Sequence, residues 1–300
     1  MAAYYNNETI LFLNGDFVKA SEAKMDFYSQ SLHYGYSVFE GIRCYKTVSG
    51  ETKIFKAAEH FERLKNSAIA MNMPYHWTNA ELIDATYEVL KQNNFGDAYI
   101  RPVVYAPANM RFDVNEQSFI VIEAWEMQPF LGDKLIRVMT SSFQRPNPKA
   151  FHIHAKAAGH YVNSILASQE AKLKGYDEAL LLDMNGFAAE GPGANLFYEK
   201  DGKLFTPAIG NILPGITRAT VFEICKELKL EVVEKFFTVE DLKNADAAFF
   251  CGTAAEVIGF ESLDEYKFPL VWNNSVSKKI QDAYKSLVIE KEFQKESELV

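Results

Sequence analysis

The segment His154-Ala155-Lys156-Ala157-Ala158-Gly159-His160-Tyr161 surrounds one amine with alanine and glycine. These small neighbours leave open space around the Lys156 amine, which a Schiff base with a carbonyl compound requires. Three further segments complement this amine chemically; they are Glu190-Gly191-Pro192-Gly193-Ala194-Asn195, Pro214-Gly215-Ile216-Thr217-Arg218 and Cys251-Gly252-Thr253-Ala254-Ala255-Glu256. Together the four segments supply an amine, an isolated carboxylate and two loops suited to a phosphate.

Glu190 stands directly before Gly191-Pro192-Gly193, so we expect it at the end of a strand, on a rigid turn. A carboxylate there could pair with a protonated ring nitrogen and keep it positive, which raises the ring's capacity to accept electrons. A glutamate on a surface turn has the same local pattern. The motif taken alone favours neither interpretation.

Two of the segments could bind an anion. Pro214 to Arg218 begins a helix, and free backbone N–H groups beside the Thr217 hydroxyl form a natural phosphate site. A helix dipole contributes only about 0.3–1 kcal/mol to a nearby anion, so an arginine partner is expected as well. Gly252-Thr253-Ala254-Ala255 follows an apolar strand and offers a second such loop. Either loop could be a simple helix cap, but two in one chain favour anion binding.

The histidines around Lys156 leave a rival interpretation open. His152 and His154 would share one face of a strand, and His160 could add a third ligand, as in a zinc-dependent hydrolase. Lys156 could also be an ordinary solvated lysine in a loop. Because the small apolar residues between the histidines suit close packing better than metal ligation, we predict no metal site.

The composition is that of an ordinary globular protein of 300 residues, 48% apolar and 24% charged. Its formal net charge of −9 argues against nucleic-acid and anionic-membrane binding, because both need a basic face. The 3 cysteines have no paired spacing, which fits free thiols in a reducing compartment. No segment approaches the roughly 18 apolar residues of a membrane span. We therefore expect a cytoplasmic protein with neither a membrane nor a nucleic-acid partner.

Residues 1–127 predict strands, two helices and then strands again, an α+β pattern. Asn14-Gly15 closes a hairpin, and one strand is expected over 37–45. Helical spacing runs from Phe61 to Met71, and a capping box at Thr78 begins a second helix. Apolar strands follow at 98–105 and 118–124. Arg101 lies on the first of these, which implies an anionic partner, either a substrate or a structural carboxylate.

The segment 128–136, with Pro129 and Gly132, is the predicted connection between a smaller domain, 1–127, and a larger domain, 137–300. In the larger domain we expect strands at 135–140, 178–182, 195–198, 203–206, 231–237 and 247–250. Helices are expected from the Lys156 segment to Leu173, over 216–228, and from about Ser275.

Eight segments occur in an order that is specific to one family; they are His33-Tyr34-Gly35, Val38-Phe39-Glu40-Gly41-Ile42-Arg43, His60-Phe61-Glu62-Arg63-Leu64, Tyr99-Ile100-Arg101-Pro102, Ala155-Lys156-Ala157, Glu190 to Phe197, Pro214 to Arg218 and Gly252 to Glu256. With them the chain resembles the fold-type IV pyridoxal-phosphate enzymes and, within these, the branched-chain amino-acid aminotransferases. The second and fourth motifs separate it from D-amino-acid aminotransferases and aminodeoxychorismate lyases, which remain the alternatives within the fold type. The resemblance implies a small N-terminal and a large C-terminal α/β domain.

The resemblance also implies the site for pyridoxal 5′-phosphate. Lys156 would form the Schiff base with this cofactor and then carry the proton. Glu190 would pair with the pyridine nitrogen, and Tyr161 with the phenolic oxygen of the ring. The implied phosphate ligands are Arg63, Ile216, Thr217 and Thr253.

The implied substrate-binding residues are Tyr34, Phe39, Gly41, Tyr99, Arg101, Thr253 and Ala254. Of these, Thr253 and Ala254 would meet the α-carboxylate, and Arg101 would bind the distal carboxylate of glutamate or 2-oxoglutarate. Tyr34 would come from a second subunit of a homodimer or larger homo-oligomer.

The implied reaction moves the amino group of leucine, isoleucine or valine to 2-oxoglutarate by a ping-pong mechanism. Three features depart from the family pattern. Phe130 stands where a tyrosine is common, Ala194 replaces a residue that is often polar, and Pro107-Ala108-Asn109-Met110-Arg111 is poor in glycine. These departures bear on the range of substrates and leave the cofactor unaffected.

Overall fold

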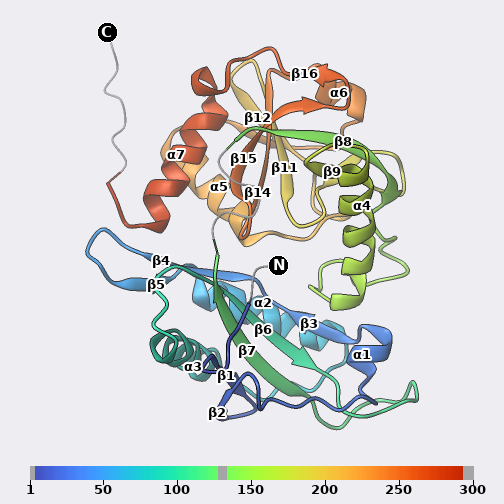
Figure 1. The fold of residues 1–300 in the computed structure, drawn as a ribbon. Coiled ribbons are helices and arrows are strands. Elements are labelled where there is room, and N and C mark those ends of the chain that lie inside the picture. Colours follow the sequence, from blue (N-terminus) through green and yellow to red (C-terminus); the bar gives the residue numbers. More distant parts are fainter. Residues whose placement is uncertain (1–3, 128–133, 293–300) are drawn as a thin grey trace.

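The computed structural model describes residues 4–127 and 134–292. Its strands form two sheets, one below the other in Figure 1, with helices on their outer faces. This arrangement confirms the α+β fold class. Most of the predicted connection at 128–136, including Phe130, lies outside the described residues, so the domain boundary stays a prediction.

The lower sheet has 7 strands in the order β2-β1-β7-β6-β4-β5, with β3 also paired to β6. Its strands are β1 (Ile10–Leu13), β2 (Asp16–Lys19), β3 (Ser37–Phe39), β4 (Ile42–Lys46), β5 (Thr52–Ile54), β6 (Ala98–Tyr105) and β7 (Phe119–Glu126). The predicted hairpin is present: Asn14 and Gly15 both have positive φ, 53° and 109°, as a primed turn requires.

The single strand predicted over 37–45 is wrong, because the chain breaks between β3 and β4 at Glu40 and Gly41. Both strands still pair antiparallel with β6. The Glu40 carboxylate is fully buried against His60 and Arg63, so its side chain leaves the alternation of a regular strand. The buried Glu40 carboxylate needs charged partners inside the domain, and this requirement overrides the strand pattern here.

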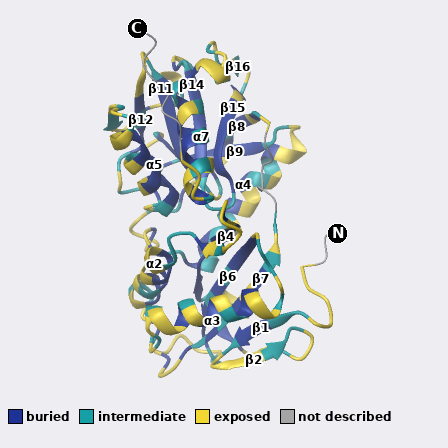
Figure 2. Cartoon of the chain, turned by 90° about the vertical axis from the view of Figure 1, so that its left-hand side faces the viewer, coloured by how far each residue is buried: buried dark blue, intermediate teal, exposed yellow. Residues whose placement is uncertain are grey.

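Helices α2 (Ala57–Ala70) and α3 (Asn79–Gln92) cover one face of this sheet. Both confirm the predictions, since Phe61 and Leu64 point into the core and Thr78 forms the capping box of α3 with Glu81. Figure 2 shows buried strands behind helices whose outer faces are exposed. A short helix, α1 (Gln30–Tyr34), was not predicted.

The upper sheet has 9 strands in the order β10-β9-β8-β15-β14-β11-β12-β13, with β16 on β15. Its strands are β8 (Ile136–Gln144), β9 (Glu178–Leu182), β10 (Ala188–Glu190), β11 (Asn195–Lys200), β12 (Lys203–Thr206), β13 (Val232–Glu234), β14 (Ala247–Gly252), β15 (Glu256–Leu263) and β16 (Tyr266–Lys267). An additional pairing of β10 with β11 closes six strands into a ring; they are β8, β9, β10, β11, β14 and β15. Closure removes free edges and brings Glu190 beside Asn195.

Side chains alternate across this sheet as expected for strands buried on both faces. On β14, Phe250 packs into the cluster inside the ring, whereas Phe249 and Cys251 face α5 (Ile216–Glu227) and α7 (Val276–Val288). Helix α4 (Tyr161–Leu173) covers β8 and β9, and the short α6 (Val239–Lys243) lies beside β14 in sequence. In the described part of the chain, no helix is long and apolar enough to cross a membrane.

Four elements of this half differ from the prediction. Strands β15 and β16 and helix α6 were not predicted, and the strand expected over 231–237 is shorter, covering only β13. The hairpin between β14 and β15 turns through Thr253, Ala254 and Ala255, and Glu256 then adopts a positive φ of 55°. Such a turn usually has glycine at this position, so its usual sequence signal is missing.

Candidate active site

A cavity lies where the two halves of the molecule meet. The lower half contributes Gly41, Arg63 and Tyr99, and the upper half contributes the remaining walls. The lining includes ten of the predicted site residues: Gly41, Arg63, Tyr99, Lys156, Tyr161, Glu190, Ile216, Thr217, Thr253 and Ala254. Residues far apart in the sequence thus converge on one cavity.

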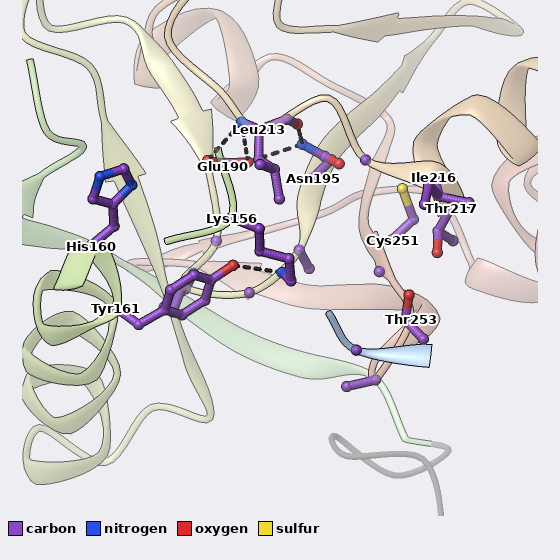
Figure 3. Close-up of a pocket in the computed structure, with 18 of the residues that line it drawn as sticks. Lys156, His160, Tyr161, Glu190, Asn195, Leu213, Ile216, Thr217, Cys251 and Thr253 are labelled. Carbon is purple, nitrogen blue, oxygen red and sulfur yellow. Dashed lines mark hydrogen bonds between the residues drawn. The ribbon is translucent and has the colours of Figure 1, made fainter. Parts of the chain in front are cut away.

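Lys156 reaches this cavity from an irregular segment just before α4. Its backbone is fixed on both sides, because its N–H donates to the Ser67 hydroxyl at 3.0 Å and its carbonyl accepts from the Phe39 N–H at 3.0 Å. The amine Nζ lies 2.6 Å from the Tyr161 hydroxyl, at the start of α4. Figure 3 shows the two side chains meeting inside the pocket. The main chain is therefore rigid while the amine faces open space.

Glu190 ends β10 and is 5% exposed. Its carboxylate accepts from Asn195 Nδ2 at 2.9 Å and from the Leu213 N–H at 3.2 Å, and Arg145 Nε lies 2.8 Å from Oε1. Burial raises the pKa of Glu190, while Arg145 acts in the opposite direction. Two hydrogen-bond donors and a cation thus converge on one buried carboxylate, which lies above Lys156 in Figure 3.

Arg63 extends from α2 to the opposite end of the cavity. Its guanidinium donates to Glu40 through Nε at 2.6 Å and Nη2 at 2.8 Å, and through Nη1 to the Pro214 carbonyl at 3.0 Å. His60 Nδ1 contacts the same carboxylate at 2.8 Å. These two partners hold the pKa of Glu40 well below its usual range despite its burial. Glu40 therefore orients Arg63 toward the loop that begins α5.

The start of α5 presents backbone donors beside Arg63. Its N-cap is Gly215, which has no side chain to satisfy the first N–H groups of the helix. A side chain at this position would collide with Asn195 Oδ1. Thr217 on the first turn and Thr253 on the β14–β15 loop line the same end of the cavity, on the right in Figure 3. This end has the chemistry of a phosphate site.

Aromatic rings wall the cavity on the side of the lower sheet. The Phe39 and Tyr161 rings pack edge to face at 4.7 Å, and the Lys156 amine lies 5.0 Å from the Phe39 ring. Arg101 stacks over the same Phe39 ring at 4.5 Å and donates to the Tyr99 hydroxyl at 3.2 Å. Phe39 and Arg101 thus stand beside the cavity lining rather than within it.

Arg101 has no carboxylate within ion-pair distance among residues 4–127 and 134–292, and its Nε is buried without a hydrogen-bond partner there. No carboxylate in these residues forms an ion pair with Arg101, although Glu123, its cross-strand neighbour on β7, interacts with it electrostatically. A cation placed among aromatic rings in this way is suited to an anion that arrives with a ligand.

Tyr34 is not part of the cavity of its own chain. It ends α1, is 46% exposed, and packs against Phe112 at 5.3 Å. Phe112 and Val114 are themselves 89% and 83% exposed. An apolar surface formed by α1 and the 107–115 loop is therefore open to solvent.

The zinc alternative is not favoured. The segment that contains His152 and His154 forms turns rather than the strand that was expected, and both residues are exposed. His160 is buried against Phe151 at 4.8 Å. Within the described ranges there is no group of three or more His, Cys, Asp or Glu side chains suited to a metal ion.

Sequence reasoning did not identify Arg145, Asn195 or Glu40 as functional residues, although all three hold the groups that line the cavity. Asn195 was interpreted only as the start of a strand, and Arg145 was not singled out. One signal was present: an arginine beside two prolines in Arg145-Pro146-Asn147-Pro148 is costly to bury unless it has an anionic partner.

Known proteins resemble this chain along most of its length. Residues 37–263 match the model of the class IV aminotransferases. A branched-chain-amino-acid aminotransferase of Salmonella typhimurium is 39% identical over 283 residues, which cover 91% of each chain. The protein is a class IV aminotransferase. Within that family it groups with the branched-chain aminotransferases, as the motifs predicted.

Two solved structures have the same fold as this aminotransferase. A branched-chain aminotransferase from Thermoproteus uzoniensis, solved with norvaline, has a TM-score of 0.91 and 38% identity, covering 95% of this chain and 96% of its own. The branched-chain amino acid aminotransferase from Thermobaculum terrenum, solved in its PLP-form, has a TM-score of 0.89 and 34% identity and covers 96% of both chains. These findings confirm the predicted family and fold.

Pyridoxal 5′-phosphate, the predicted cofactor, fits the cavity of this aminotransferase. The Lys156 amine suits the aldehyde of the cofactor, and the buried Glu190 carboxylate suits its ring nitrogen. The uncapped start of α5 suits the phosphate. Gly41 leaves room at the lower wall, since a side chain there would collide with the Tyr99 hydroxyl. The prediction of this cofactor is confirmed by the family and by the PLP-form of the Thermobaculum terrenum structure.

Proposed function

We propose that the protein transfers the amino group of leucine, isoleucine or valine to 2-oxoglutarate, and catalyses the reverse reaction. The observation that carries this proposal is the Lys156 amine, which faces the cavity with Glu190 and the start of α5 placed around it. When bound, pyridoxal phosphate supplies an aldehyde for this amine and a ring that accepts electrons from the substrate. Two half-reactions at one site give ping-pong kinetics.

Lys156 acts at the reacting carbon of the substrate. With the cofactor bound, its amine would hold the aldehyde and would move the proton from and to the α-carbon of the substrate. The Tyr161 hydroxyl accepts from this amine at 2.6 Å and orients it, and it would donate to the phenolic oxygen of the ring. Glu190, which Arg145 and Asn195 hold in place, would accept from the protonated ring nitrogen and stabilise its positive charge.

The phosphate is held by Arg63, by the N–H groups of Ile216 and Thr217, and by Thr253. A helix N-terminus and an arginine fork both favour a dianion. Thr253 and Ala254 bind the α-carboxylate of the substrate from the β14–β15 loop, and Gly41 leaves the space that the substrate needs beside Tyr99.

The side-chain pocket accepts an apolar group in one half-reaction and a carboxylate in the other. Phe39 and Tyr99 supply aromatic walls for leucine, isoleucine and valine. Arg101, which stacks on these rings, binds the distal carboxylate of 2-oxoglutarate. The aromatic partners shield the guanidinium without neutralising it, so both kinds of ligand can occupy the same space.

A homodimer or larger homo-oligomer completes the pocket with Tyr34 of a second copy. The exposed apolar surface of α1 and the 107–115 loop supports this assembly, since isolated monomers seldom leave such surface in contact with water. We also propose domains at 1–127 and 137–300 joined by 128–136, because β1–β7 and β8–β16 form separate sheets. Three buried free cysteines favour the cytoplasm.

The test is glutamate formation from leucine and 2-oxoglutarate by the protein with its cofactor. Lys156→Ala should reduce turnover at least about 10³-fold, as loss of a covalent catalyst does. Lys149→Ala removes an exposed lysine from the same segment and should leave turnover unchanged. Appreciable transamination by Lys156→Ala, or equal losses in both variants, would remove Lys156 from the mechanism. An inactive wild-type protein would overturn the proposed reaction.

A further inference from the structure

Glu256 occupies a backbone conformation that glutamate rarely adopts. It is the first residue of β15, its φ is 55°, and it pairs with Gly252 across the three-residue turn of Thr253, Ala254 and Ala255. In hairpins of this length the corresponding residue is usually glycine, because a Cβ atom is strained in the left-handed region. A strained residue beside a binding loop calls for a compensating role of its side chain.

The Glu256 side chain is held by two donors from the lower sheet. Its Oε1 accepts from Arg43 Nη1 at 2.8 Å and from the Tyr45 hydroxyl at 3.0 Å. Arg43 is 4% exposed and Glu256 is 7% exposed, so the ion pair is sheltered from solvent. Because both donors lie on β4, this contact joins the two halves of the molecule directly beside the β14–β15 loop.

The same network reaches two other parts of the site. Arg43 Nη2 donates at 3.1 Å to the carbonyl of Met127, the last described residue before the predicted domain connection. Tyr284, on α7, interacts with both Tyr45 and Thr217. The anchor of Glu256 is thus tied to the first turn of α5 as well as to the end of the lower sheet.

We propose that Glu256, anchored by Arg43 and Tyr45, is a positioning residue that sets the 253–255 loop for the α-carboxylate of every substrate. This inference rests on the proposed function, which assigns that carboxylate to Thr253 and Ala254. The anchor lies on the lower sheet, whereas the loop belongs to the upper sheet. Carboxylate binding therefore depends on how the two halves are held together.

The critical variant is Glu256→Gly, because glycine suits a positive φ and preserves the turn while removing the anchor. If the turn alone mattered, this change would be neutral or favourable. Glu256→Gln retains an acceptor oxygen for both donors, so it should keep the loop in place and leave KM close to the wild-type value. Arg43→Met combined with Glu256→Gly avoids leaving a buried guanidinium unpaired. Asp201→Gly, at another turn residue with a positive φ of 50°, is the matched control.

The holoenzyme variants should be assayed with leucine and 2-oxoglutarate at saturating cofactor. In Glu256→Gly and in the double variant, KM should rise about tenfold for both substrates, with kcat changed by less than about threefold, since both share the α-carboxylate. 4-Methylvalerate is a carboxylate that lacks the amino group of leucine. Calorimetry should show that the variants bind it more weakly than wild type by about the same factor. Asp201→Gly should match wild type in all three measurements.

Unchanged KM values and unchanged 4-methylvalerate affinity in Glu256→Gly would overturn the inference, as would a rise in KM for only one substrate. Calorimetry also separates this failure from that of the proposed function. If the wild-type protein binds 4-methylvalerate but does not transaminate, the reaction is wrong, and the loss of affinity in Glu256→Gly still decides the role of Glu256.

Discussion

Replacing Glu40 by glutamine should destabilise the protein and weaken its hold on the cofactor phosphate. Glu40 is fully buried and receives two guanidinium contacts from Arg63, at 2.6 and 2.8 Å, and one from His60 at 2.8 Å. Removing one partner of a buried ion pair costs about 3–5 kcal/mol, because the remaining charge is left uncompensated. At about 2–4 °C per kcal/mol, the apparent Tm should fall by about 6–20 °C.

The loss of stability in Glu40→Gln should become smaller as the pH falls. Arg63 and His60 depress the pKa of Glu40 far below its ordinary value of 4.5. The folded protein therefore keeps the carboxylate ionised at pH values where the unfolded chain binds a proton, and its stabilising effect is present above about 4.5. As pH falls below that value, the wild-type advantage over Glu40→Gln should shrink.

Thermal unfolding of both proteins at about pH 7.5 and about pH 4 measures the two effects, on either side of the unfolded pKa. Phosphate affinity of the cofactor-free protein measures the orientation of Arg63. Glu240→Gln is the control, since Glu240 is 82% exposed and pairs with Lys243 at 3.4 Å. That change should cost less than about 1 kcal/mol. The reasoning would be refuted if the Tm of Glu40→Gln fell no more than that of Glu240→Gln. It would also be refuted if the difference in Tm between wild type and Glu40→Gln grew on acidification.

Three other residues around the cavity can be tested by substitution. Arg101→Met should raise KM for 2-oxoglutarate at least about tenfold more than KM for leucine, because the half-buried guanidinium is proposed to bind only the distal carboxylate. Equal rises in the two KM values in steady-state kinetics would contradict this. Gly41→Ala should raise KM for leucine, because the new methyl group would displace the Tyr99 hydroxyl. Gly96→Ala, whose methyl group meets only ordinary contacts, serves as the control. Burial, reinforced by Arg145, lowers the pKa of His160 to about 4 from 6.5. Stability should therefore be lost as pH falls from about 6.5 to 4, and acid titration of His160→Asn should show a smaller loss in that window.

Elements governed by local chemistry were predictable. The capping box at Thr78 and the spacing of Phe61 and Leu64 defined α2 and α3, because helix starts and apolar faces depend on neighbours within one or two turns. The primed turn at Asn14-Gly15 defined the first hairpin for the same reason. The motif around Lys156, together with the three segments that complement it, indicated the chemistry of the site, because small neighbours leave room for a Schiff base.

Elements governed by residues far away in the sequence were not predictable. The strand expected over 37–45 breaks because the Glu40 carboxylate is drawn to Arg63, 23 positions away. Strand β15 escaped prediction because Glu256, where a hairpin usually has glycine, is held by Arg43, 213 positions away. In both cases a buried ion pair outweighs a local preference of about 1–2 kcal/mol.

The sequence by itself determined the family and most of the helices and strands, because these follow from short motifs and from the spacing of apolar residues, and it singled out Lys156 as the proposed reacting amine. Only the tertiary structure decided which charges meet. Arg145 pairs with Glu190 and Arg43 pairs with Glu256, while the Arg101 guanidinium lies over the Phe39 ring. An ion pair forms wherever folding brings two charges within a few ångströms, and no local pattern along the chain encodes that distance.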